Sequence, residues 1–587
     1  MVRRGERRMA LITKPKQKPK KKKKNPPSPD EQKALDLKKA FENRFRSTFT
    51  NAGFRRLPGV DGVHFEFEGL KSELDDIFVY ENVFIFAEYT ISNLSNLSTH
   101  AKGKAGIHNK ISANPFGFLA HLRSISKRLD KALENYSYTK NQTLSCIIYG
   151  TDPTLENHHK ALFDHTKFIS RPERVYFRKL ALTLRKSSRY ELFDFLGIDA
   201  ARVGHLGTVP TGSQSDRYHG SLLPDEHSNF PPGYRIVSFY VDPEALLKRA
   251  YVLRRDGWKD SQNLYQRMII PGKIKGIRRY LREQHRVFAN NIVITLPDNT
   301  EFRDDEGAII DSGAIGTTTP AWVEIADAPN TIGIVDGQHR VFSYYEDLKP
   351  DSLIDQYRRQ QNLLATGIVY PKNIVGTAKE QFEAELFLEI NSNQSGARSD
   401  LKQAIWLILD PFKPVSVARN VVNRLAATAP LNGILEQSAY DVGRLRTTTI
   451  VTYGIQPLVK RSGKDSLFSI WNDAQKAEII DGKKDAGVLE RYLEFCAGHI
   501  ADFLSIARTK LKAEKWAIPS KTGPGVLSVA TVNGLIILMR KLIDGGYITH
   551  DSIKVDLAPL DDMNLKDVKS SQYAALAALA YHKVTGT

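Results

Sequence analysis

The chain has 587 residues, of which 41% are hydrophobic and 26% are charged, and its formal net charge is +18. This length allows about three or four domains, and no stretch approaches the roughly 18 consecutive apolar residues that a membrane-spanning helix needs. The two cysteines, Cys146 and Cys496, exclude a disulfide framework and a cysteine metal site, so we expect a cytoplasmic protein with no membrane partner.

The first 29 residues are predicted to form a disordered basic tail. They hold twelve Lys or Arg residues and a single Glu, which accounts for +11 of the total charge and leaves +7 for the rest of the chain. Prolines are frequent there and apolar residues are few, so the segment cannot build a core. Such a tail binds nucleic acid without sequence preference through phosphate contacts. A tail that only keeps the protein soluble is the alternative.

Residues 30–203 are predicted to form an α/β domain. Leu37, Phe41, Phe45 and Phe49 recur at every fourth position, which is typical of one face of a helix. The further elements that we expect are strands at 64–69, 73–80, 83–88 and 143–149, a helix at 114–133, and basic helical sequence within 175–196.

Three carboxylates of this domain are candidates for catalysis. Glu42 lies on the opening helix, Asp75 lies on one strand, and Glu88 ends the next strand. Carboxylates on neighbouring strands can converge at a sheet edge on one Mg²⁺ or Mn²⁺ ion, which activates water and neutralises the charge of a phosphodiester. Asp75 and Glu88 are therefore the predicted metal ligands, and a solvated strand edge is the alternative.

The stretch 75–90 resembles the core of the PD-(D/E)xK nucleases, and Glu42 matches the carboxylate on their first helix. The resemblance implies a restriction-endonuclease-like fold that binds DNA and cuts it. Those nucleases have a Lys two residues after the Glu, whereas this chain has Thr90, which carries no charge to stabilise the reaction. Lys102 or Lys104 is the candidate replacement. An intact nuclease, a degenerate DNA-binding relative and coincidence all stay open.

A segment rich in Gly, Ser, Pro and His, residues 204–233, is predicted to be a linker or a long functional loop. A second domain is expected at 234–410, and it starts with a strand at 235–241 and a helix at 243–253. Residues 411–587 are predicted to form a helical C-terminal region. We find no group of side chains there that indicates a chemistry.

Within the second domain, a short apolar run, residues 332–336, leads into a helical pattern through the turn Asp336-Gly337-Gln338-His339-Arg340. Such a turn presents backbone N–H groups at the positive end of a helix dipole, and His339 and Arg340 lie beside them. We therefore expect this turn to hold an anionic group, above all a phosphate. An ordinary helix start with Asp336 as its cap is the alternative.

The pentapeptide is the name-giving motif of the DGQHR-domain family, and other segments resemble that family in the same order. They are Tyr265-Gln266-Arg267, a basic helix from Lys273 to Arg282, Phe288-Ala289-Asn290-Asn291 before a strand, and Phe387 to Gln394. The family in turn resembles the ParB and sulfiredoxin superfamily, in which a similar helix start holds the phosphates of a nucleotide. Some of its members accompany DNA-modification and phage-defence systems.

This resemblance implies a ParB-like α+β domain that binds a nucleotide, such as a nucleoside triphosphate, or a DNA phosphate at residues 336–340. Asp336 would cap the helix or hold a metal, and Gln338 would orient water or read a base. Arg267 and Asn391 match family positions that turn toward the same pocket. Taken singly, they are a surface arginine and a turn former, and His339 is equally compatible with a core position.

The leading hypothesis is a bacterial DNA-associated protein of a defence or DNA-modification system. It binds DNA and a nucleotide, it works with other proteins of such a system, and its first domain is a candidate nuclease. Two alternatives come from other classes: a non-catalytic, DNA-binding transcriptional regulator, and a nucleotide triphosphatase that gates a partner enzyme.

Overall fold

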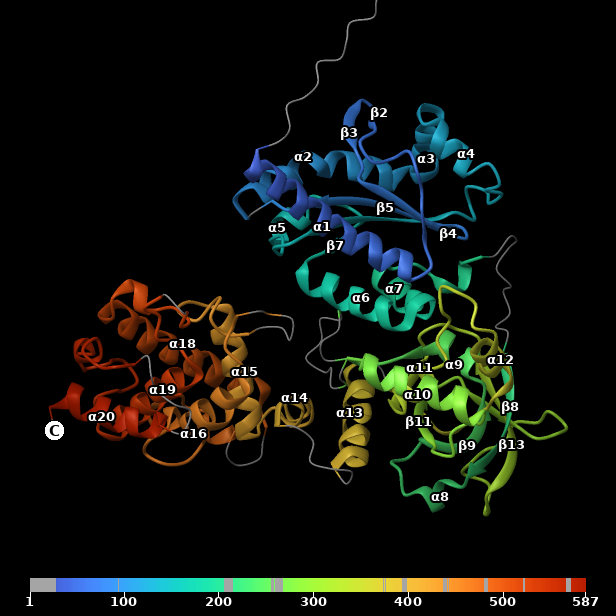
Figure 1. Ribbon diagram of the computed structural model, residues 1–587. Coiled ribbons are helices and arrows are strands. Elements are labelled where there is room, and N and C mark those ends of the chain that lie inside the picture. The colour runs from blue at the N-terminus through green and yellow to red at the C-terminus, as the bar shows by residue number, and fades with distance from the viewer. Residues whose placement is uncertain are drawn as a thin grey trace, which may run out of the picture.

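The computed structural model describes residues 28–92, 94–204, 215–254, 258, 266, 268–372, 374, 376–392, 399–436, 441, 443–479, 484–520, 523–565 and 572–586. The protein is a multidomain α/β protein in which two mixed sheets with their helices are followed by a helical region (Figure 1). Nearly all of the predicted basic tail lies outside the described residues, as does Arg267. In the part of the chain that is described, no helix is long and apolar enough to cross a membrane.

The first domain is built on a five-stranded sheet with the order β1-β4-β5-β6-β7. Its strands are β1 (Arg55–Arg56), β4 (Asp76–Tyr80), β5 (Val83–Thr90), β6 (Leu144–Thr151) and β7 (Thr166–Ile169), and a separate hairpin consists of β2 (His64–Phe67) and β3 (Leu70–Glu73). The pairs β1–β4 and β4–β5 are antiparallel, whereas β5, β6 and β7 run parallel. The parallel strands therefore end at one common edge of the sheet.

Helices cover both faces of this sheet. They are α1 (Pro29–Asn51), α2 (Leu94–Ala113), α3 (Pro115–Ile125), α4 (Lys127–Ala132), α5 (Asn157–Lys160), α6 (Arg171–Leu184) and α7 (Arg189–Leu196). Phe45 of α1 stacks on Tyr89 with ring centroids 4.5 Å apart, and Phe118 of α3 packs against Phe86 at 5.4 Å. Because successive residues of β5 point to opposite faces, α1 and α6 cover one side of the sheet and α2 and α3 cover the other.

The second domain contains an eight-stranded sheet with the order β10-β14-β11-β15-β9-β8-β13-β12. Its strands are β8 (Ser215–Leu223), β9 (Arg235–Val241), β10 (Ala250–Tyr251), β11 (Ile292–Leu296), β12 (Glu301–Arg303), β13 (Thr319–Ala326), β14 (Ile332–Asp336) and β15 (Leu363–Val369). Its helices are α8 (Asp225–Ser228), α9 (Pro243–Arg249), α10 (Pro271–Gln284), α11 (Gln338–Phe342), α12 (Ser352–Gln360), α13 (Thr377–Ser392) and α14 (Ser399–Leu409). Residues of α9 to α12 pack on one face, and α13 packs on the other, where Phe382 stacks on Tyr234.

One boundary of the sequence prediction is wrong. The segment predicted as a linker or long loop, 204–233, contains strand β8, which pairs with β9 and with β13. The glycines of this segment favoured a loop prediction, but Gly220 lies in the middle of β8. A Cβ at this position would lie 2.9 Å from the carbonyl oxygen of Ser238. This glycine allows a close approach of backbones inside a sheet, so it does not mark a loop.

The named elements beyond residue 410 are all helical, as the sequence predicts. They are α15 (Pro414–Ala427), a π-helix (Ile450–Ile455), α16 (Gln456–Leu458), α17 (Leu467–Ile470), α18 (Ala486–Lys510), α19 (Val529–Asp544) and α20 (Tyr573–Thr585), with short 3-10 turns between some of them. They enclose an apolar core of their own, to which the two sheets do not contribute. This region therefore has its own packing.

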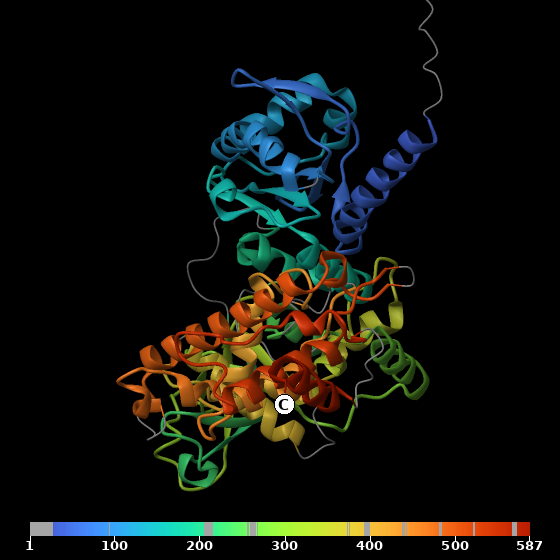
Figure 2. The same ribbon diagram turned by 90° about the vertical axis from the view of Figure 1, so that its left-hand side faces the viewer.

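The first two domains share one continuous apolar core, and α6 and α7 lie between their sheets (Figures 1 and 2). Arg254 of the second domain is completely buried and donates to Glu191 of α7 at 2.5 Å and to the hydroxyl of Tyr176 at 3.1 Å. Glu346 accepts in turn from Lys186 at 2.8 Å and from Arg189 at 3.1 Å. The interface therefore holds charged pairs as well as apolar contacts.

We expect Glu191→Ala to destabilise this interface strongly. It would leave the buried Arg254 guanidinium without its ion-pair partner, and uncompensated buried charges cost roughly 3–5 kcal/mol. Glu490→Ala is the control, because its pair with Arg424 is exposed at the surface and such pairs contribute about 1 kcal/mol or less. In thermal unfolding, the midpoint of the first transition should be much lower than that of wild type for Glu191→Ala, and it should be nearly unchanged for Glu490→Ala. Equal midpoints for the two variants would contradict this account of the interface.

Candidate active site

Two of the predicted carboxylates, Asp75 and Glu88, lie close together where strands β4 and β5 pair. Asp76, the first residue of β4, pairs with Ala87 in the antiparallel register, and Asp75 directly precedes the strand. The N–H of Asp75 also donates to the carbonyl of Ala87 at 3.1 Å, so the regular pairing ends at Asp76, and the N–H of Tyr89 donates to Asp75 Oδ2 at 2.7 Å. Glu88 lies on the face of β5 that α2 and α3 cover, and the charge of Asp75 raises the pKa of Glu88, so the two carboxylates are neighbours.

Asp76, the neighbour of Asp75, points to the other face, as period-two geometry predicts. Its carboxylate is buried and accepts from Arg56 and, at 2.7 Å, from Arg46 of α1. Both oxygens of Asp76 are thereby satisfied. We assign Asp76 to holding α1 on the sheet.

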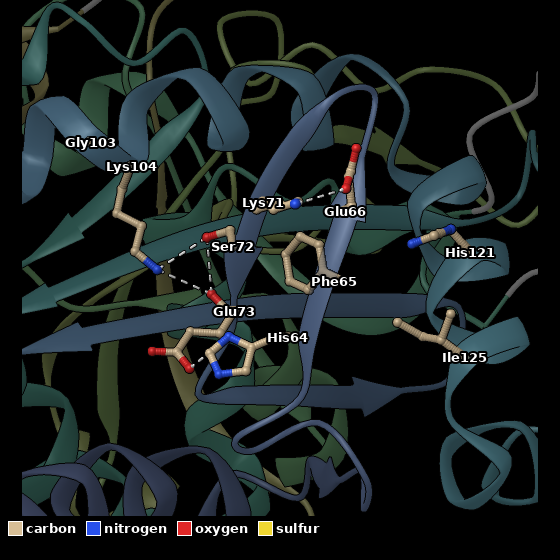
Figure 3. Close-up of a pocket in the computed structure, with 10 residues that line it drawn as sticks. All are labelled: His64, Phe65, Glu66, Lys71, Ser72, Glu73, Gly103, Lys104, His121 and Ile125. Atoms are coloured by element: carbon tan, nitrogen blue, oxygen red, sulfur yellow. Dashed lines mark hydrogen bonds and ion pairs between the residues drawn. The ribbon is translucent and has the colours of Figure 1, made fainter.

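A lysine from α2 reaches the carboxylate of Glu88. Lys104 Nζ lies 2.9 Å from Glu88 Oε1. Figure 3 shows that it also donates to Ser72 Oγ and to the carbonyl of Glu73, each at 3.2 Å. Thr90 stands where the nuclease motif has its lysine, and its hydroxyl bonds to Ser92 Oγ at 2.8 Å. Lys104 therefore brings to Glu88 the positive charge that Thr90 cannot supply.

The other candidate lysine, Lys102, is a correction to the predicted site. It lies two residues before Lys104 on α2, which turns its side chain by roughly 200° around the helix axis. Lys102 is exposed, and after burial and the charge of His158 its own charge also lowers the pKa of His159 on α5, so it lies on that side of the helix. Of the two lysines, Lys104 is therefore the one that contacts Glu88.

The two neighbouring carboxylates have raised pKa values. Burial raises the pKa of Glu88 to about 7, against the lowering effect of Lys104, and the charge of Asp75 raises this pKa further. Burial likewise raises the pKa of Asp75 to about 6, although the hydrogen bond from Tyr89 lowers it. The side chain of Glu88 is 6% exposed, and its Oε2 atom has no hydrogen-bond partner among the described residues. A cation beside these oxygens would stabilise both charges.

The third predicted carboxylate, Glu42, is buried on α1. It forms ion pairs with Arg46 at 3.1 Å and Lys38 at 3.7 Å, and its negative charge contributes to the raised pKa of Asp75. Glu42 therefore lies near the pair, as predicted, but it already has two cationic partners.

The oxygen donors of Asp75 and Glu88 suit a hard divalent cation such as Mg²⁺ or Mn²⁺. The buried, unpartnered Oε2 of Glu88 is the observation that favours such an ion. Over the described ranges, Glu42, Asp75 and Glu88 do not bring three ligand atoms within 4.8 Å of one another. We therefore expect two protein ligands, with water in the remaining positions, which is how Mg²⁺ is commonly held.

A cavity of about 730 Å³ opens beside Lys104 (Figure 3). It is lined by the β2–β3 hairpin, α2 and α3 through His64, Phe65, Glu66, Lys71, Ser72, Glu73, Gly103, Lys104, His121 and Ile125. Lys104 thus belongs both to this cavity and to the carboxylate pair. The cavity offers a substrate room to approach the pair from the side of the hairpin.

The chain matches no protein-family model, no curated protein and no solved structure in the three comparisons. The resemblances found in the sequence therefore stay predictions. What can be said about the site depends on its own geometry.

In the second domain, the predicted phosphate-binding turn uses its side chains within the protein. Arg340 donates to Asp336 Oδ2 at 2.9 Å and to the carbonyl of Asn291 at 2.6 Å, while His339 Nε2 accepts from the backbone N–H of Ile270 at 3.2 Å. The backbone N–H groups of Arg340 and Val341 donate to the carbonyl of Gly337 inside α11. These bonds tie the turn to β11 and α10.

Burial lowers the pKa of His339 to about 4, and the charges of Lys273 and Arg254 lower it further. The imidazole is therefore neutral at neutral pH and supplies no positive charge to a phosphate. Gly337, at φ +97°, is needed because a side chain there would be strained and its Cβ would lie 2.6 Å from Ile292. Gln338 begins α11. These observations favour a structural role for the motif.

The other two residues of this predicted pocket add no support for it. Asn391 lies near the end of α13, and its carboxamide donates to the carbonyl of Phe387 on the same helix at 2.8 Å. Arg267 lies outside the described residues. The structure thus brings together Asp75, Glu88 and Lys104, but it shows no comparable convergence at 336–340.

Without divalent cations, we expect the folded protein to lose stability as the pH rises. The Glu88 carboxyl has an ordinary pKa of 4.5 and a pKa of about 7 in the folded protein. Between these values the folded state binds more protons than the unfolded state, so the free energy of unfolding falls with pH, by about 1.4 kcal/mol per unit of pKa difference.

Thermal unfolding in a chelator at about pH 5 and about pH 8 measures this effect. Wild type should lose more stability across the interval than Glu88→Gln, and adding Mn²⁺ at the higher pH should stabilise wild type only. Parallel pH profiles for the two proteins would show that Glu88 is not the titrating group.

Proposed function

We propose that the first domain is a nuclease that cleaves phosphodiester bonds of DNA with a divalent cation. The observation that carries this proposal is the contact of Lys104 with Glu88 at 2.9 Å, beside the carboxylate of Asp75. The arrangement has the residue types of the PD-(D/E)xK motif, with the lysine supplied by α2 instead of β5. The raised pKa values of both carboxylates further support a cation between them.

Each side chain has a distinct role in this proposal. Asp75 and Glu88 would hold Mg²⁺ or Mn²⁺, which supplies Lewis-acid chemistry and a water nucleophile when bound. The N–H of Tyr89 fixes the orientation of the Asp75 carboxylate. Lys104 holds Glu88 in place, and its ammonium group stabilises negative charge that develops on the phosphate oxygens. Because Glu88 is buried and Asp75 is half-buried, these charges act in a medium of lower dielectric than water, where they are stronger.

The wider proposal is a DNA-associated protein of a bacterial defence or DNA-modification system, with the second and third regions serving partners or DNA. Phosphate or nucleotide binding at residues 336–340 stays a prediction, because Arg340 and His339 already have partners in the protein. The transcriptional regulator and the nucleotide triphosphatase remain the alternatives if cleavage is absent.

Cleavage of supercoiled plasmid with Mg²⁺ or Mn²⁺ tests the proposal. Wild type should nick or linearise the plasmid, and Asp75→Asn and Glu88→Gln should abolish this activity because they remove the ligands. Lys104→Met should lower the rate by about 10²- to 10³-fold, the effect expected from removing one electrostatic contact to the transition state.

Lys102→Met is the matched control, because it removes the same charge from the same helix at an exposed position. It should retain cleavage near the wild-type rate. Intact plasmid at high wild-type concentration, or cleavage that survives in Glu88→Gln, would contradict the proposal.

A further inference from the structure

A concave, strongly basic groove lies where the first two domains meet. It encloses about 640 Å³ and is lined by Arg44, Arg174, Val175, Arg178, Lys179, Leu182, Thr183, Arg185, Pro271 and Lys275. Six of these ten residues are Lys or Arg, and none is Asp or Glu. Positive charge that gathers in a concave surface focuses the electric field and attracts anions.

Three helices from the two domains build this groove. Arg44 comes from α1, Arg178 and Lys179 come from α6, and Lys275 comes from the first turns of α10. These helices lie one below another across the front of the molecule (Figure 1). The basic stretch that begins α10 thus faces the first domain, so the groove exists only when both domains are docked.

Most of the positive charge in the groove is not neutralised by the protein. Arg44, Arg178, Lys179 and Lys275 are exposed, and their side chains form no ion pair or hydrogen bond within the described residues. Arg174 differs, because it is buried and pairs with Asp152. Four unpaired cations of like sign repel one another, and a bound polyanion would relieve that repulsion.

The groove and Glu88 lie on opposite faces of the first sheet, because α1 and α6 cover one face and Glu88 points to the face that α2 covers. They meet at one edge of the sheet. Asp152, the partner of Arg174, directly follows β6, and β6 runs parallel to β5 with Tyr149 opposite Glu88. A strand of nucleic acid held in the groove would therefore reach Glu88 by passing around the carboxyl ends of β5 and β6.

We propose that this groove binds the phosphate backbone of DNA and delivers it to the first domain. This inference rests on the proposed function, because it takes DNA to be the substrate. Arginine forks and lysine ammonium groups bind phosphates well, and the few apolar residues in the lining offer little anchorage to a peptide. The second domain contributes to DNA binding through Lys275 at this surface, away from residues 336–340.

Charge reversal of two exposed residues on α6 tests the groove. Arg178→Glu with Lys179→Glu changes the charge by −4, and Arg508→Glu with Lys583→Glu makes the same change at exposed positions of the C-terminal region. All proteins keep the full chain, including the basic tail. Binding of a labelled DNA duplex is measured by fluorescence anisotropy in a chelator at several salt concentrations.

The groove variant should bind DNA at least about tenfold more weakly than wild type, whereas the control variant should stay within about twofold. For the groove variant, the slope of log affinity against log salt should be shallower than that of wild type by about 1.8, since each lost phosphate contact removes about 0.9 from the slope. Arg178→Gln with Lys179→Gln should give a smaller loss in the same direction, and its unchanged unfolding midpoint would show that the fold is intact.

Equal affinities of wild type and the groove variant, or equal losses in the groove and control variants, would overturn the proposal. Binding in a chelator does not depend on cleavage. A groove that binds DNA in a protein that never cuts would therefore disprove only the nuclease, and active cleavage with an unaffected groove variant would disprove only the groove.

Discussion

Two neighbouring carboxylates beside a strand pair impose the main physical constraint on this protein. Glu88 is buried on β5 and Asp75 directly precedes β4, and desolvation makes the charged form of each unfavourable. The described structure places Lys104 beside them, but one ammonium group does not balance two carboxylates. Either protons or an added cation must supply the rest.

The carboxylates of this site were predictable from sequence, but their lysine was not. Strand β5 is an apolar run that contains Glu88 near its end, and Asp75 directly precedes β4. Both residues could therefore be assigned from local pattern alone. The lysine depends on which face of α2 meets the sheet. Gly103 and Gly106 lie in that helix, and a stretch with two glycines does not indicate a helix from propensity. Only the tertiary packing distinguishes Lys104 from Lys102.

The second domain shows the same limit of local reasoning. Strand β14 and the turn at Gly337 were expected and are present, because an apolar run that ends in Asp-Gly is a strong local signal. The partners of Arg340 and His339 come from Asn291 and Ile270, which lie far away along the chain. Strand β8 was missed because its pairing with β9 and β13 is set by distant residues and not by its own composition.

Direct titration of the full chain with Mn²⁺, followed by calorimetry at about pH 8, tests the central claim most directly. Glu156, His158 and His159 form a separate group whose ligand atoms lie within 4.8 Å of one another, so a variant with both histidines changed to alanine belongs beside Glu88→Gln. The account predicts that Glu88→Gln weakens binding by about tenfold or more, roughly 1.4 kcal/mol, while the histidine variant keeps the wild-type affinity for that ion. Binding that survives in Glu88→Gln and disappears in the histidine variant would contradict it.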